Sequence, residues 1–234
     1  MELEFIKDMF NSIAPRYDFL NRLLSLRRDI YWRREMVKAL DIPKEGRILD
    51  IACGTGDVMV EFIRQKKSGR QLFGLDFAPE MLYVARQKLE ALPETGRTHL
   101  IAGNGLYLPF LPDFFDAMTI AFGIRNIIDR LGALQTFYEH LTPGGSLAVL
   151  ELATPNQRML KFFYSAYFER LLPTIGGFVS SNRMAYRYLP ASVLRFPDPV
   201  KFADLMRSAG FKEIRWRRLT LGLATLHVGI KPKP

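Results

Sequence analysis

The sequence predicts an α/β fold in which a mostly parallel, seven-stranded sheet is covered by helices on both faces. Between residues 47 and 152, apolar runs of strand length alternate with segments of helical periodicity. A glycine turn, Gly54-Thr55-Gly56, joins the first run to a helical pattern, and Asp76 ends the next run, 20 residues after Gly56. An acid at about that spacing typically accepts the two hydroxyls of a bound ribose, so we expect an adenosine-containing cofactor.

The remaining elements extend this alternation. Residues 5–40 carry aromatic side chains on helical segments punctuated by Pro15 and Asp18, and Pro143-Gly-Gly145 predicts a turn. The expected strands are 47–52, 71–76, 98–102, 115–122, 146–152, 213–220 and 223–230, with helices at 57–67, 79–91, 130–140 and 202–209. We expect one domain with an N-terminal helical cap (1–42), a cofactor-binding core (43–155), a helical substrate lid (156–197) and a C-terminal helix and strand hairpin (198–234).

Within the expected lid, residues 159–172 are helical and apolar nearly all round. This segment is either a buried core helix or the wall of a pocket for a hydrophobic ligand. No run in the sequence reaches the roughly 18–20 apolar residues of a membrane span. The N-terminus is too acidic for a signal peptide and the single cysteine, Cys53, allows no intramolecular disulfide, so we expect a cytoplasmic protein.

The net charge of +9 bears on which binding partners the protein has. Arginines cluster at residues 27–34 beside Tyr31 and Trp32, and again at 215–218 around Trp216. A basic excess can be a solvated face, or it can bind nucleic acid or an anionic membrane. Arginines interleaved with aromatic side chains suit a lipid headgroup layer at least as well as RNA, which extends the expected location to the membrane periphery.

The glycine turn separates two classes of enzyme. A nicotinamide-binding fingerprint requires a third small residue where this chain has Met59. Asp50 and Asp57 flank the turn, and two carboxylates would repel a pyrophosphate but attract a cationic ligand. S-adenosylmethionine combines an adenosine with positive charge and no phosphate. Turn and helix-cap chemistry is the alternative role of the two acids.

Several motifs carry a family resemblance. The glycine turn with its flanking acids, Asp76 and Pro143-Gly-Gly145 resemble a class I, Rossmann-like, S-adenosylmethionine-dependent methyltransferase. Further motifs resemble the ubiquinone/menaquinone biosynthesis C-methyltransferase family over about residues 5–232: Arg16-Tyr-Asp18, Leu108-Pro-Phe110, Phe122-Gly-Ile-Arg-Asn126, Tyr186-Arg-Tyr-Leu189 and Leu226-His227. The elements at 122–126 and 186–189 are specific to that family, whereas the glycine turn is not.

The resemblance implies a set of site residues and no metal. The implied cofactor-binding residues are Asp50, Gly54, Thr55, Gly56, Asp76, Asn104, Gly105 and Ala121, and the implied catalytic residues are Tyr17, Arg125 and Asn126. Thr55 would meet the methionine carboxylate, Asp76 the ribose and Asn104 the adenine. The chain departs from the family pattern at Gly105, where Ala is usual, and at Ala121, which is often Ser and here offers no side-chain hydrogen bond.

The implied reaction is C-methylation of a polyprenyl quinol, either demethylmenaquinol or the corresponding ubiquinone precursor. A guanidinium cannot act as a base at neutral pH, so Arg125 would stabilise a phenolate or orient a water. Each candidate also has a structural alternative. Arg125 could pair with Asp129, Tyr17 could be core packing, and His227 could be a satisfied strand histidine.

Two other classes compete with this interpretation. An amino-group methylase would often carry an Asp/Asn-Pro-Pro-aromatic turn where this chain has Phe122-Gly-Ile-Arg, and an RNA cytosine methylase needs a nucleophilic cysteine outside the cofactor loop that holds Cys53. A non-enzymatic scaffold that binds the cofactor is the third class. We therefore expect a quinol substrate, contact with an anionic membrane and no nucleic acid, and the sequence leaves a homodimer open.

Overall fold

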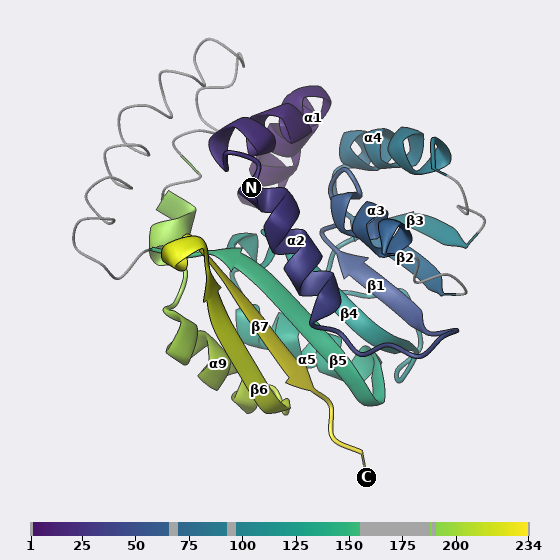
Figure 1. The fold of residues 1–234 in the computed structure, drawn as a ribbon, viewed down its shortest axis with the longest axis vertical. Helices are drawn as coiled ribbons and strands as arrows, with labels where there is room; N and C mark the ends of the chain where they lie inside the picture. Colours follow the sequence, from purple (N-terminus) through teal and green to yellow (C-terminus); the bar gives the residue numbers. More distant parts are fainter. Residues whose placement is uncertain (1, 66–69, 93–96, 155–187, 189–190, 234) are drawn as a thin grey trace.

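The computed structural model describes residues 2–65, 70–92, 97–154, 188 and 191–233 (Figure 1). Most of the expected lid, including the apolar segment 159–172, lies outside these residues. No helix that the structure describes has the length and apolar character that crossing a membrane requires.

The sheet has seven strands in the order β3-β2-β1-β4-β5-β7-β6, which confirms the expected fold class. The strands are β1 (Arg47–Ile51), β2 (Gln71–Asp76), β3 (Thr98–Ala102), β4 (Phe115–Ala121), β5 (Leu141–Leu152), β6 (Lys212–Leu219) and β7 (Ala224–Ile230). The first five strands pair in parallel, and β7 runs antiparallel to both β5 and β6. The strand order reverses between β1 and β4, where loops at the carboxyl ends diverge and leave room for a ligand.

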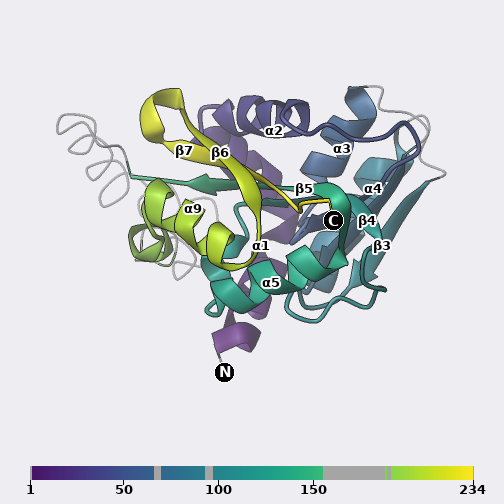
Figure 2. The ribbon, with the colours of Figure 1, turned by 90° about the horizontal axis from the view of Figure 1, so that it is seen from below.

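Helices cover both faces of the sheet (Figures 1 and 2). One face carries α2 (Arg28–Lys38), α3 (Asp57–Arg64) and α4 (Pro79–Glu90), and the other carries α5 (Arg130–His140) and α9 (Pro199–Ser208). Strand β1 shows why: Ile48 packs into the first layer, whereas Leu49 and Ile51 pack into the second. A strand buried on both faces needs an almost continuous apolar run, and the sequence provides one here that only Asp50 interrupts.

Helix α1 (Glu2–Leu24) lies over the carboxyl edge of the sheet and differs from the expectation. Pro15 does not interrupt it, although a proline removes one helical hydrogen bond and costs about 3 kcal/mol. Next to the proline, Ile13 and Ala14 are buried against Ala78 and Met81 at the start of α4, and this packing offsets the cost.

The expected turn at 143–145 is also different. Strand β5 begins at Leu141 and continues through these residues, with Gly144 at φ +86° and a register shift between Phe115 and Ala117 of β4. The glycine accommodates the irregularity inside the strand because left-handed backbone is accessible to it.

Candidate active site

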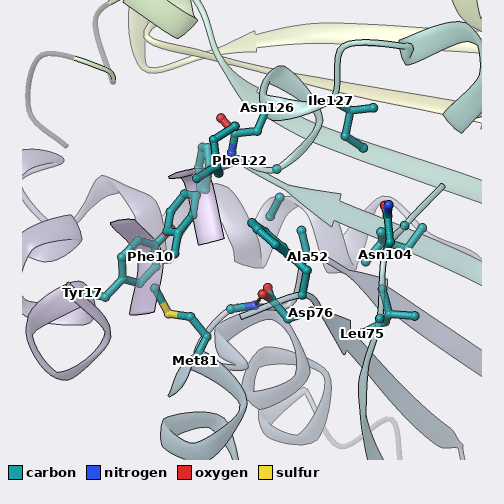
Figure 3. A pocket seen from close by; sticks show the side chains of 18 residues that line it. Phe10, Tyr17, Ala52, Leu75, Asp76, Met81, Asn104, Phe122, Asn126 and Ile127 are labelled. Carbon is teal, nitrogen blue, oxygen red and sulfur yellow. Dashed lines mark hydrogen bonds between the residues drawn. The ribbon is translucent and has the colours of Figure 1, made fainter. Parts of the chain in front are cut away.

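A cavity opens at the carboxyl edge of the sheet, at the point where the strand order reverses (Figure 3). Loops after four parallel strands and one face of α1 form its walls. The lining includes Ala52, Gly54, Asp76, Gly103, Asn104, Gly105, Ala121, Phe122 and Asn126 from the sheet edge, and Ile6, Phe10 and Tyr17 from α1. Of the predicted cofactor-binding residues, the cavity therefore brings together Gly54, Asp76, Asn104, Gly105 and Ala121.

Asp76 shapes the glycine turn. Its Oδ2 accepts the N–H of Gly54 at 2.8 Å, and its Oδ1 accepts the N–H of Ala78 at 2.9 Å. Burial raises the pKa of Asp76, and these backbone hydrogen bonds oppose the rise. Gly54 has φ +54°, a conformation that places its backbone at the cavity without a Cβ. The carboxylate thus fixes the turn and the cavity wall together.

Two non-glycine residues beside the turn also adopt left-handed backbone conformations. Ala52 has φ +51° after β1, and Phe122 has φ +59° after β4, and both line the cavity. Such strained positions concentrate at functional sites because the surrounding structure holds them there.

Asn104 and Gly105 follow β3 and form the side wall. The Asn104 Oδ1 accepts the N–H of Leu106 at 3.0 Å, which fixes the loop in a local turn. A Cβ at Gly105 would lie 3.0 Å from Cγ2 of Ile51, so the loop packs closely on the end of β1.

Asp50 is close to this site but does not line the cavity. Its Oδ1 accepts the Thr119 hydroxyl at 2.7 Å, and its Oδ2 has no hydrogen-bond partner among the described residues. Burial raises the pKa of Asp50 to about 7. Any effect of this carboxylate on a ligand in the cavity would act through its charge and not through contact.

The expectation that Asp57 flanks a cationic ligand is wrong. The Asp57 carboxylate lies 2.9 Å from Arg22, 2.8 Å from Lys88 and 3.5 Å from Arg33. Burial alone would raise its pKa, but these cations hold the pKa well below its usual range. The Asp57 carboxylate is therefore engaged in an ion cluster outside the cavity lining and does not face the ligand site.

Thr55 and Gly56 also lie outside the cavity. The Thr55 hydroxyl donates to Asp18 at 2.6 Å and accepts from Lys88 at 3.1 Å, so it faces the ion cluster around Asp57. A Cβ at Gly56 would lie 3.3 Å from Cβ of Ala85, and the glycine therefore permits close packing of the turn on α4. In this structure, the Thr55 side chain is used to hold α1 against the turn.

Two of the three predicted catalytic residues line the cavity. Tyr17 reaches it from α1, and Asn126 reaches it from the loop after β4 (Figure 3). Burial raises the pKa of Tyr17, opposed by its hydrogen bond with Asn21, so the phenol stays neutral. The Asn126 Oδ1 accepts the Tyr188 hydroxyl at 3.1 Å.

Arg125 lies behind this wall in a buried ion pair. Its Nη1 donates to Oε1 of Glu151 at 2.8 Å and also to the Phe122 carbonyl, while Glu151 Oε2 accepts the Arg125 N–H at 3.2 Å. Burial lowers the pKa of Arg125, but Glu151 outweighs it and the net pKa is raised. The structural alternative for Arg125, a pair with Asp129, is wrong, since Arg125 pairs with Glu151 and Asp129 caps α5 by accepting the Gly132 N–H at 2.9 Å.

Sequence reasoning missed Glu151. It is fully buried on β5, and its carboxylate is the sole acidic group of the run 146–152. An acid inside an otherwise apolar strand requires a buried partner, and that requirement is the signal that could have identified it.

His227 lies outside the cavity lining, but it is not the fully satisfied histidine of its alternative interpretation, because its Nδ1 has no hydrogen-bond partner among the described residues. It is fully buried on β7, its Nε2 lies 3.0 Å from the Pro199 carbonyl, and its ring packs against Phe202 and Trp216. Burial lowers its pKa to about 4.

Comparison with known proteins identifies the family of the chain. The model of the ubiE/COQ5 methyltransferase family matches residues 1–231. A Geobacter sulfurreducens protein named ubiquinone/menaquinone biosynthesis C-methyltransferase UbiE is 46% identical over 97% of this chain and 89% of its own length. A Thermus thermophilus protein named demethylmenaquinone methyltransferase is 46% identical over 96% of this chain and 100% of its own length.

Solved structures agree on the fold. A Haemonchus contortus phosphoethanolamine N-methyltransferase, solved with S-adenosylhomocysteine, is 15% identical and superposes with a TM-score of 0.64 over 86% of this chain and 52% of its own. A methyltransferase from Thermotoga maritima, 21% identical, gives a TM-score of 0.66 over 96% and 99% of the two chains. The full-length family match and the two close relatives establish that this chain belongs to the ubiE/COQ5 methyltransferase family.

Proposed function

We propose that this chain uses S-adenosylmethionine to methylate a ring carbon of demethylmenaquinol, giving menaquinol. The observation that carries the proposal is that one cavity joins Gly54, Asp76 and Asn104 to Tyr17 and Asn126. The relatives' names support a quinol substrate, and the Thermus relative's name favours the menaquinone branch. The ubiquinone precursor is the alternative substrate.

The residues at the cavity fit an adenosyl cofactor. Gly54 presents backbone without a Cβ, Asp76 is a buried acceptor for ribose hydroxyls, and Gly105 lets the loop after β3 pack closely on Ile51 at the cavity wall. Asp50 adds a buried carboxylate oxygen with no hydrogen-bond partner among the described residues, which favours a cationic ligand nearby. When bound, the cofactor supplies an electrophilic sulfonium methyl group.

The opposite wall would handle the quinol. Arg125 stays protonated, and its charge would stabilise the negative charge that develops on a quinol oxygen. The neutral Tyr17 phenol and the Asn126 amide would orient the ring and a water that accepts the proton. Glu151 would act as a positioning residue, because it holds the Arg125 guanidinium and the backbone N–H together.

Labelled methyl transfer to a quinol extract and to total RNA tests the proposal. We expect label in the quinol, a loss of about 10²–10³-fold in turnover for Arg125→Ala, and cofactor affinity within about twofold of the wild type. Glu151→Gln should lower turnover with little change in cofactor affinity, and Arg207→Ala, an exposed arginine, serves as the control.

Three outcomes would contradict the proposal. Equal losses of turnover and cofactor affinity in Arg125→Ala would remove its assigned role. Label in RNA but not in the quinol would indicate an RNA methylase. Tight cofactor binding with no transfer to either substrate would favour a scaffold.

A further inference from the structure

Two exposed leucines occupy left-handed backbone positions on neighbouring turns. Leu26, between α1 and α2, has φ +51° and is 80% exposed. Leu221, in the turn η3 (Thr220–Gly222) between β6 and β7, has φ +56° and is 70% exposed. L-residues rarely adopt this conformation, and a branched apolar side chain gains nothing from water there.

The two turns lie side by side although they are almost 200 residues apart in the chain. The Trp32 indole donates to the Thr220 hydroxyl at 2.7 Å, and Arg217 pairs with Glu35 at 2.7 Å. Trp32 lies one helical turn, about 6 Å, beyond the start of α2. Figure 2 shows the yellow turn between β6 and β7 close to α2. These contacts join α2, which follows the first turn directly, to the second turn, and we define the exposed leucines and arginines of both turns as the two-turn surface (Leu26, Arg27, Arg28, Arg218 and Leu221).

The charge of the two-turn surface is positive. Arg27, Arg28 and Arg218 are exposed, and their guanidinium groups form no ion pair within the described part of the chain. The acid nearest to the first turn, Asp29, is buried against Arg22 and Arg33, and residues 214–230 contain no acid. Among the described residues, no exposed carboxylate of the two turns offsets these arginines.

We propose that the two-turn surface docks on an anionic lipid bilayer, with Leu26 and Leu221 inserted among the acyl chains. Apolar side chains flanked by arginines match the boundary between headgroups and hydrocarbon. RNA would leave two exposed leucines without an apolar partner, and a second copy of the chain would bring the same arginines against each other.

The surface also lies at the side of the molecule where a lipid-tailed substrate would enter. Turn η3 follows β6, which runs in the same direction as β5, and so it lies at the carboxyl edge of the sheet that forms the cavity. Helix α1 carries Tyr17 at the cavity and ends at Leu24, about 10 Å further along its axis. This part of the inference rests on the proposed quinol substrate.

Vesicle binding of the full chain tests the surface. Leu26→Asn and Leu221→Asn suit the left-handed backbone, because Asn tolerates it, and both should leave the fold intact. Each should lower partition onto phosphatidylcholine/phosphatidylglycerol vesicles about tenfold. Leu111→Asn is the matched control, since Leu111 is 72% exposed but precedes β4 at the opposite edge of the sheet. Arg27→Gln with Arg28→Gln should remove most of the dependence on phosphatidylglycerol and on salt.

The proposal would be overturned if the Leu26→Asn/Leu221→Asn double variant partitioned onto vesicles as strongly as the wild-type protein. The proposal would also be overturned if the wild-type protein bound total RNA but no vesicles, and if the arginine variants abolished that RNA binding. Methylation of a short-tailed demethylmenaquinol in vesicle-free buffer separates the two proposals. Leucine variants should retain that activity, whereas a wild-type protein that binds vesicles but methylates no quinol would refute the function and leave the surface standing.

Discussion

Replacing Asp50 with Asn should stabilise the cofactor-free protein at alkaline pH. The substitution keeps the acceptor for the Thr119 hydroxyl and removes a buried charge whose Oδ2 has no hydrogen-bond partner among the described residues. Burial raises the pKa of Asp50 from 3.8 to about 7. The folded state therefore holds a proton between these two pH values that the unfolded state has released, and the stability contributed by Asp50 is lost as the pH rises through this window.

The size of the pKa shift of Asp50 sets how much stability the substitution recovers. A difference of about 3 pKa units at 1.36 kcal/mol per unit gives at most about 4 kcal/mol at pH 8. About 1.7 kcal/mol of this is already lost at pH 5, so the advantage of Asp50→Asn should grow by about 2.5 kcal/mol between pH 5 and pH 8.

Urea unfolding of both proteins at the two pH values measures this difference. The titration of His227 acts equally in wild type and variant and cancels in the comparison. Asp204→Asn, at a carboxylate whose side chain is 61% exposed, is the control and should show no such trend. An Asp50→Asn advantage that is the same at pH 5 and pH 8, or a variant less stable than wild type at pH 8, would refute the reasoning.

Three other variants test the packing, the buried histidine and the ion cluster. Gly74→Ala should lower the free energy of unfolding by about 1–3 kcal/mol in urea titrations, because its Cβ would lie 2.6 Å from Sδ of Met59. With its pKa lowered to about 4, His227 should make stability rise by about 3 kcal/mol from pH 4 to pH 6.5, and His227→Gln should flatten that slope. Lys88→Met removes one of the cations that pair with Asp57, so it should lower the free energy of unfolding by about 1–3 kcal/mol. It should also speed proteolysis of α1, and an unchanged cleavage rate would contradict the role of the ion cluster.

The order of helices and strands was predictable because its signals are local. The run at Ile48–Ile51 places apolar residues on both faces of the strand, with Asp50 as its single polar member, and this pattern indicates a buried parallel strand. Asp76 and Asn104 were predictable as cavity residues for a similar reason. Asp76 is the last residue of β2 and Asn104 follows β3, and the carboxyl ends of parallel strands meet at one edge of the sheet.

Side-chain direction in the glycine loop was not predictable, because distant residues determine it. Thr55 and Asp57 turn away from the cavity toward Asp18 and Arg22, which lie more than 30 positions earlier in the chain. The pairing of Arg125 with Glu151 likewise joins two strands' ends that no periodicity connects. The sequence pattern indicates which residues lie near the site, whereas tertiary contacts decide which of them face it.

The position of β7 has a consequence for how the chain folds as it is synthesised. Among the seven strands it is the last in chain order, yet it lies between β5 and β6 and not at an edge. The parallel part of the sheet can therefore assemble while translation continues, but β6 has no neighbour until β7 has left the ribosome. A chain truncated before residue 224 would expose β5 as a sheet edge and leave β6 without a partner strand, which makes it a substrate for quality-control proteases.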